Sequence, residues 1–181
     1  MNQTEMPQTE DAAKAPKSLR PTIIAALCLF VLDSVVLHQL SMAMMTVLAL
    51  VFRLIPMTLY HAIKGNRGIA VIRAQKVLVY LVTVTAIFIS FNLNNRLAEQ
   101  RAEGVIGAID KFHDQRGHYP KSLQELVPEY LEVIPRANFT LTGGRFDYFS
   151  YGDAPSLMYY SYWPFARRHF NFKGRKWYII D

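Results

Sequence analysis

Two long apolar runs limit what this chain can fold into. Residues 22–60 contain only two charged side chains, Asp33 and Arg53, and residues 77–92 contain none. A membrane-spanning helix needs about 20 apolar residues. The first run is long enough for two such helices, and the polar residues 38–41 divide it. The sequence therefore predicts three spans, at about 22–38, 42–60 and 77–92.

The charges predict how these spans are oriented. Residues 53–76 carry five bases and no acid, whereas residues 93–181 carry 12 bases and 10 acids, only +2 of the net +6. Bases gather on the cytoplasmic side of membrane proteins, so we expect a cytoplasmic basic loop at 61–76. Three spans then leave residues 1–20 as a disordered cytoplasmic tail and place residues 93–181 outside the cytoplasm. The excess charge reflects orientation, and nucleic acid is not an expected partner.

The segment after the last apolar run predicts a long helix and then a short one. Over residues 94–114, apolar side chains recur at steps of three and four and form one stripe. The stripe consists of Ala98, Ala102, Val105, Ile109 and Phe112. Gly117 is a suitable stop for this helix. Ser122 followed by Glu125 forms a capping box, which predicts a short helix beginning at Ser122.

The rest of the chain predicts strands, at 139–142, 146–151, 157–163, 168–172 and 176–180. Gly143-Gly144 predicts a hairpin between the first two strands, and Lys173-Gly174-Arg175 predicts one between the last two. The expected fold class is a membrane α-helical part of three spans (21–92) followed by an α+β domain (93–181), in which a long helix packs on a small antiparallel sheet.

The segment 117–128, GHYPKSLQELVP, carries a resemblance to a known family. It is similar to the pilin and pseudopilin superfamily, and most of all to the major pseudopilin of type II secretion, in which a segment of the form G-x-Y-P-x-S-L-x-x-L-V-P follows a long helix. The matching residues are Phe112, Gly117, Tyr119, Pro120, Ser122, Leu123, Leu126, Val127 and Pro128. The resemblance implies a helix half in the membrane and half under a small sheet, and a bacterial inner-membrane protein with a periplasmic domain.

Two departures from the family change the expected role. Pilins are processed after a glycine that precedes an apolar helix with Glu at its fifth position. Here the nearest candidate is Gly68, with Arg73 where that Glu would stand, and two spans precede it. We therefore expect a chain that is neither processed nor polymerised. Asp147 and Asp153 lie where major pseudopilins bind calcium, but they do not fit that motif and we interpret them as surface acids beside turns.

Candidate chemical sites are few. Asp33 and Arg53 are expected to form a contact within the membrane, either structural or with a partner, since ionisable groups there are costly. The histidines 113, 118 and 169 lack metal-site spacing, and the methionines 42, 44 and 45 are interpreted as helix packing. No G-x-S-x-G elbow and no phosphate loop is present. We expect no enzyme activity, cofactor or metal.

The last strands combine aromatic and basic side chains. We expect one face of each strand to fill a small core with these aromatics while the bases are solvated beside a hairpin. The second interpretation is a surface that binds another protein, with Tyr160, Tyr162, Trp163, Arg167 and Arg168 as its candidates. The leading hypothesis is a non-enzymatic accessory protein of a type IV pilus or type II secretion-like envelope system, in contact with lipid and with envelope proteins. Two alternatives remain: an autonomous membrane-anchored binding or sensing domain, and a transporter subunit that uses Asp33.

Overall fold

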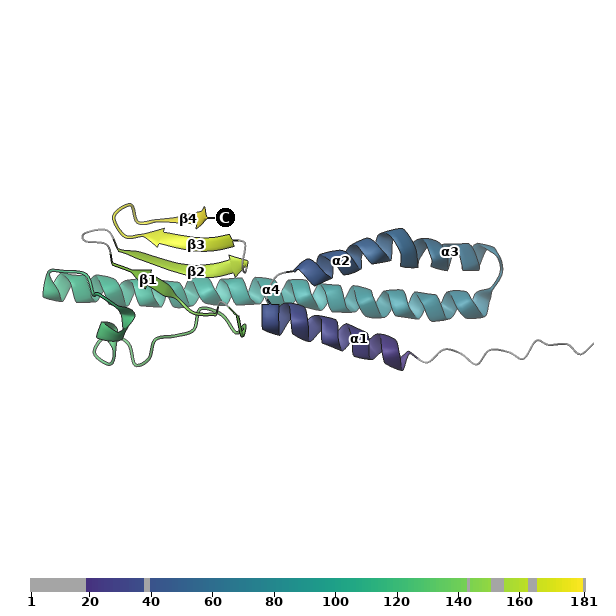
Figure 1. Cartoon of the computed structure of the whole chain (residues 1–181), viewed down its shortest axis with the longest axis horizontal. Helices are drawn as coiled ribbons and strands as arrows, with labels where there is room; N and C mark the ends of the chain where they lie inside the picture. Colours follow the sequence, from purple (N-terminus) through teal and green to yellow (C-terminus); the bar gives the residue numbers. More distant parts are fainter. Residues whose placement is uncertain (1–18, 38–39, 143, 151–154, 163–165, 181) are drawn as a thin grey trace, which may run out of the picture.

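The computed structural model describes residues 19–37, 40–142, 144–150, 155–162 and 166–180. Two helical rods come first among the described residues, a long helix follows, and a four-stranded sheet forms the C-terminal part (Figure 1). Residues 1–18 of the predicted tail lie outside the described residues. Asp153 and Trp163 also lie outside them.

Helix α4 (Arg67–Arg116) is the spine of the molecule. Its 50 residues extend for about 75 Å, with the other helices along one half and the sheet along the other (Figure 1). The helix ends at Gly117, which adopts a left-handed conformation (φ 72°) and donates its backbone N–H to His113 O at 2.8 Å. Glycine suits that conformation, so the predicted stop is confirmed.

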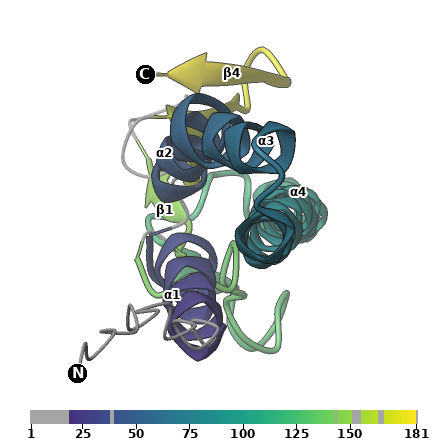
Figure 2. The same cartoon turned by 90° about the vertical axis from the view of Figure 1, so that its right-hand side faces the viewer.

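The N-terminal half consists of two further helical rods packed on α4. The first is α1 (Arg20–Phe30), which continues as the π-helical segment η1 (Val31–Leu37), and the second joins α2 (Ser41–Ala49), η2 (Leu50–Leu54) and α3 (Ile55–Ile63). Seen along the long axis, α1 and α3 lie beside α4 at different positions around it (Figure 2). Pro56 explains η2, because proline lacks an N–H and its ring displaces the carbonyl four residues earlier.

In the described part of the chain, three helices are long and apolar enough to cross a membrane: Arg20–Leu37, Ser41–Ile63 and α4. Most of their large apolar side chains face outward; Phe52 is 77 % exposed and Ile63 is 86 % exposed. The prediction of a loop over residues 61–76 is wrong. Only a short turn at 64–66 separates α3 from α4, so Arg73 and Lys76 extend from the first turns of a helix.

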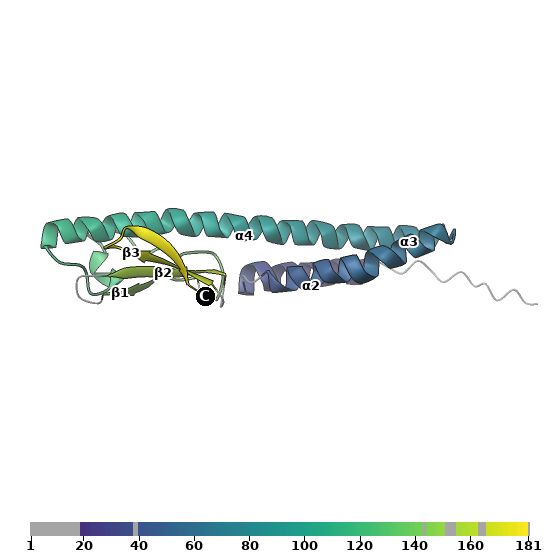
Figure 3. The same ribbon diagram turned by 90° about the horizontal axis from the view of Figure 1, so that it is seen from above.

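The sheet contains β1 (Asp147–Phe149), β2 (Ser156–Tyr162), β3 (Ala166–Asn171) and β4 (Lys176–Ile180), antiparallel and in that order. It lies on the same side of α4 as α2 does, along the other half of the helix (Figure 3). The predicted α4 stripe is confirmed, since all five of its residues are buried. They pack with Leu157, Tyr159, Phe170 and Phe172 from the sheet and the following turn.

Two local predictions are wrong. Residues 139–142 do not form a strand, and the first hairpin is absent from the described residues around Gly144. The helix after Ser122 is a single 3₁₀ turn, η3 (Leu123–Leu126), and the Ser122 side chain does not cap it. The Glu125 carboxylate instead accepts the Lys121 N–H at 3.3 Å. One turn is sufficient to bury Leu123 and Leu126 against the core.

Candidate functional site at the junction of the two halves

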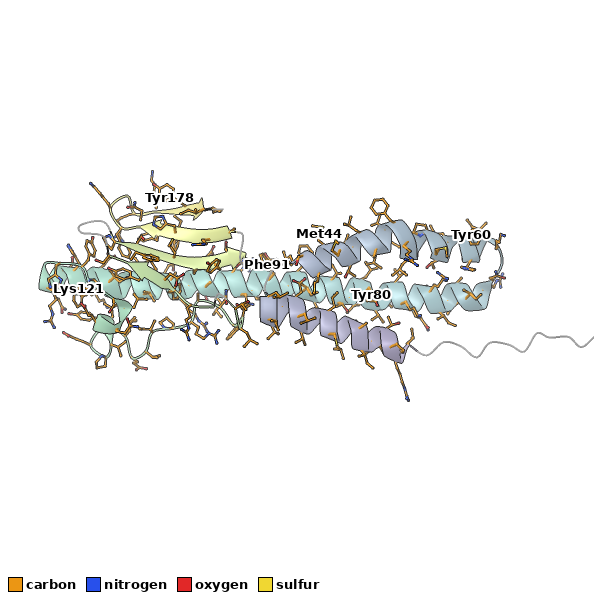
Figure 4. The ribbon with its side chains drawn as sticks, viewed as in Figure 1. Met44, Tyr60, Tyr80, Phe91, Lys121 and Tyr178 are labelled. Carbon is orange, nitrogen blue, oxygen red and sulfur yellow. The ribbon has the colours of Figure 1, made fainter. Side chains whose placement is uncertain are left out.

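The junction loop, which we define as residues 136–142 with Gly144, lies where the helical half meets the sheet half. Inside this loop, side-chain hydrogen bonds take the place of the strand pairing that the sequence predicted at 139–142. Asn138 Oδ1 accepts the Thr140 N–H at 3.2 Å and the Thr140 hydroxyl at 2.5 Å. Gly144 is required by close packing, since a Cβ there would lie 2.7 Å from Thr140 O. Phe91 of α4 marks the level of this junction in Figure 4.

The junction loop joins the end of η1 to the sheet domain. Leu141 donates its N–H to Val35 O at 2.9 Å, and the Thr142 hydroxyl donates to Val36 O. The last carbonyls of a helix have no partner within it, so the loop satisfies two of them. On α4, Asn94 Oδ1 accepts the Phe139 N–H at 3.2 Å.

Asp33 holds the start of α2. It is 1 % exposed, and its Oδ2 accepts the Ala43 N–H at 2.8 Å. Leu40, the residue before α2, supplies no side-chain cap, so Asp33 provides one from the preceding rod. The expected contact with Arg53 is not found among the described residues: Arg53 is exposed on η2, and none of the ion pairs there includes it. The orphan N–H groups of a helix start attract the carboxylate.

A long apolar groove runs beside this junction. It has a volume of about 720 Å³, and its walls come from α1, η1, α4 and Phe139. A second groove of about 390 Å³ continues between α1 and α4, and the two share Phe30 and Ala86. Sequence reasoning missed this groove. The sequence does show that Arg96 is the first charged residue after the uncharged run that begins at residue 77. That position could have indicated a polar end to an apolar surface.

The structure separates the residues predicted to form a partner surface. Tyr160 and Arg167 are in register on adjacent strands, and the guanidinium lies 4.9 Å from the ring centre. Arg168 instead forms an ion pair with Glu99 of α4, so its side chain lies on the other face of the sheet. Successive side chains of a strand point to opposite faces, which explains the separation. Tyr162 belongs to β2 by its backbone, and Trp163 lies outside the described residues.

The residues of the 117–128 segment fasten the end of α4 to the sheet. Tyr119 stacks on His113 with ring centres 4.1 Å apart and meets Phe172 edge-on. Pro120 O accepts the Tyr148 hydroxyl at 2.9 Å. Pro128 follows η3, after a cis peptide bond. Their contacts are with the core, so the segment is a structural element.

The half-buried Tyr148, the buried Tyr159 and one ion pair complete the electrostatics of the sheet domain. Burial raises the pKa of Tyr148 and of Tyr159 to about 12. Arg175 forms two-pronged hydrogen bonds with Asp110 at 3.1–3.3 Å, and these raise the pKa of its guanidinium. Within the described ranges, no group of three or more His, Cys, Asp or Glu side chains is placed to hold a metal ion.

Comparison of this chain with protein-family models, with curated proteins and with solved structures finds no match.

Proposed function

We propose that this chain is a non-enzymatic accessory protein of a type IV pilus or type II secretion-like envelope system in the bacterial inner membrane. In this proposal it crosses the membrane three times, with the N-terminus in the cytoplasm and the sheet domain in the periplasm. The observation that carries the proposal is α4, which runs without a break from the apolar helices to the core beneath the sheet. That arrangement is the one the pilin resemblance implies.

The packing around α4 favours an accessory role over a polymerising subunit. The pilin resemblance implies one long helix whose apolar half lies in the membrane. Here α1 and α3 already lie against that half of α4. Gly68, the nearest candidate for a processing site, is the second residue of α4 and follows the turn from α3. A chain built in this way presents a pilin-like outer domain without the free helix that a filament requires.

The outer face of the sheet, turned away from α4, is the proposed contact surface. Its residues are Met158, Tyr160, Arg167, His169, Tyr178 and Ile180, which align in two rows across β2, β3 and β4. Tyr178 is 48 % exposed and Ile180 is 46 % exposed. Aromatic residues and arginine are enriched in the cores of protein interfaces, so this face suits a protein partner.

Photo-crosslinking in native membranes tests the proposal. A benzophenone amino acid replaces Tyr160 in the full-length chain, and the matched control places it at Lys173, which is exposed in the turn between β3 and β4. We expect adducts with a pilus or secretion component from position 160 only. We also expect Arg167→Glu to reduce co-purification of that component several-fold, with Lys173→Glu unchanged. If no such component is found in the adducts or the co-purified material, the proposal is wrong.

A membrane-anchored binding domain is the second candidate function, and one observation favours it. Two polar hollows of about 340 and 520 Å³ flank the junction loop and share Arg136 and Arg145. Arginine side chains lining one hollow suit a small anionic ligand, although the Arg136 guanidinium also donates to Thr140 O. Calorimetric titration of the purified full-length protein with citrate and with inorganic phosphate tests this candidate. Saturable heat that Arg145→Gln abolishes would support it, and the absence of heat with both anions would contradict it.

A further inference from the structure

The apolar groove beside the junction has the form of a lipid site. Phe30 and Val35 form one wall, Ala86, Ile89 and Leu93 of α4 form the other, and Phe139 covers the upper end. Most of the exposed lining is apolar, with Ser34, Ser90 and Asn94 as the polar residues partway along it. Ile89 is 56 % exposed and Leu93 is 60 % exposed, so the groove is open along its α4 wall and can be entered from a surrounding bilayer.

The end of the groove nearest the sheet domain, which we call its upper end, carries a charged and a polar side chain of α4. Arg96 and Gln100, one turn apart on α4, both line it and both are exposed. Among the ion pairs of the described residues none includes Arg96, and the acid nearest in sequence, Glu99, is held by Arg168. The guanidinium of Arg96 is therefore available to an anion from outside the chain.

Ser34 is a second, independent indication of a ligand. Its side chain lines the groove, the residue is 5 % exposed, and its hydroxyl has no hydrogen-bond partner in the described structure. A buried hydroxyl normally has a partner. Asn94, the other buried polar residue of the lining, already accepts the Phe139 N–H. An acceptor that enters the groove from outside would satisfy Ser34.

The length of the groove matches one leaflet of a bilayer. The α4 wall of the groove extends from Ala86 to Gln100, a separation of 14 residues, or about 21 Å of helix. Half of a bilayer, with its headgroup layer, is about 20–22 Å thick. The second groove, which begins at Phe30 and Ala86, continues toward the other leaflet and leaves room for a long acyl chain.

We infer that this groove binds one anionic phospholipid, with an acyl chain between α1 and α4, an ester oxygen at Ser34 and the phosphate at Arg96 and Gln100. A protein helix in the same place would have to bring an acid of its own to Arg96, because burying the guanidinium without a counter-charge is costly. A zwitterionic headgroup would bring its own cation close to Arg96 and to Arg101, whose guanidinium lies 5.0 Å from the centre of the Phe139 ring. The inference depends on membrane insertion and not on the identity of a protein partner.

Photoactivatable lipids test the inference directly. The full-length protein is placed in nanodiscs that contain traces of phosphatidylglycerol or phosphatidylcholine with a diazirine in the acyl chain, and labelled peptides are mapped by mass spectrometry. We expect phosphatidylglycerol to label residues 30–37 and 86–93 roughly fivefold more than phosphatidylcholine does, since a basic side chain at a membrane surface favours anionic lipid by about that factor.

Three variants of the same full-length chain give the test its controls. Arg96→Gln is expected to lower labelling by phosphatidylglycerol to the phosphatidylcholine level, and Arg96→Lys to retain most of it. Arg67→Gln makes the same change at the other end of the apolar part of α4 and is expected to leave labelling unchanged. Equal labelling by both lipids in the unaltered protein would overturn the inference. Absence of labelling by either lipid would also overturn it, because a protein segment would then occupy the groove.

Discussion

Replacement of Asp33 offers the sharpest test of how the junction is held together. Its carboxylate accepts the Ala43 N–H at 2.8 Å in a buried setting, and Ala43 is the third residue of α2. Asp33→Ala removes the acceptor and leaves that N–H buried without a partner. Asp33→Asn keeps an oxygen in place but removes the charge. The two variants therefore separate the hydrogen bond from the interaction of the charge with the helix start.

The expected magnitudes follow from these two contributions. An unsatisfied buried donor costs about 1–3 kcal/mol, which corresponds to a roughly 5- to 150-fold increase in the opening equilibrium of the first turn of α2. Loss of the charge alone costs about 0.3–1 kcal/mol, which is at most roughly fivefold. Asp33→Ala should therefore open this turn much more often than Asp33→Asn does.

Hydrogen–deuterium exchange of the peptide covering 41–49, in the full-length protein, measures this opening. The matched control is Thr85→Val, which removes an exposed hydroxyl that donates to Leu81 O on α4 and should leave exchange in α2 unchanged. Exchange at the rate of the unaltered protein in Asp33→Ala would refute the capping role. Equal acceleration in the Asn and Ala variants would show that the charge, and not the hydrogen bond, is what matters.

Three further predictions concern the stability of the sheet domain. Gly144→Ala should lower stability by about 1–3 kcal/mol, since the new methyl would lie 2.7 Å from a backbone oxygen; the melting temperature of the purified protein measures the loss. Ile109→Ala, at a fully buried position, should cost about 2–5 kcal/mol, whereas Ile179→Ala, at a position 68 % exposed, should change stability by about 0.5 kcal/mol or less; urea unfolding compares them. Burial raises the pKa of Tyr159 to about 12 from about 10 in an unfolded chain. The contribution of Tyr159 to stability should then fall between pH 10 and 12; Tyr159→Phe should make the total fall shallower, and the part that remains comes from Tyr148, whose pKa is also raised to about 12.

Each of these has a clear contrary result. A melting temperature unchanged by Gly144→Ala would mean that the junction loop does not pack as described. Similar losses for the two isoleucine variants would contradict the placement of the core between α4 and the sheet. A stability that rises between pH 10 and 12 would contradict the raised pKa. When a phenol binds its proton more tightly in the folded state, ionisation of the unfolded chain lowers the stability of the protein.

The features that the sequence predicted correctly depend on short-range patterns. The α4 stripe repeats every three or four residues, so it identifies the buried side of a helix wherever that helix packs. The hairpin between β3 and β4 has a turn at residues 172–175, and Gly174 N donates to Asn171 Oδ1 at 2.9 Å. The capping box failed for a tertiary reason, because Leu123 and Leu126 are held by the core and the chain turns after a single 3₁₀ turn.

The junction loop could not be predicted, because its partners are far away in sequence. Thr142 contacts Val36, 106 residues earlier. The strand-like alternation at 139–142 does exist, but it is inverted: Thr140 is fully buried, whereas Phe139 is 68 % exposed and Leu141 is 67 % exposed. In water this pattern indicates a strand with its apolar side turned inward. Beside a bilayer, apolar side chains can point outward while the polar ones bond within the loop.

That inversion supports the proposed membrane placement. Separate parts of the chain place the membrane surface on the sheet side at the same level. Lys76 and Arg96 lie 20 residues apart on α4, or about 30 Å, which is the hydrocarbon thickness of a bilayer. The second rod, with 23 residues from Ser41 to Ile63, spans about 33 Å between its ends. Phe139 and Leu141 expose apolar surface at the level where α4 gains its first outer cation, and aromatic and basic side chains gather at such interfaces. The junction that joins the two halves thus coincides with the plane where lipid headgroups would lie, and this is also where the groove ends at Arg96.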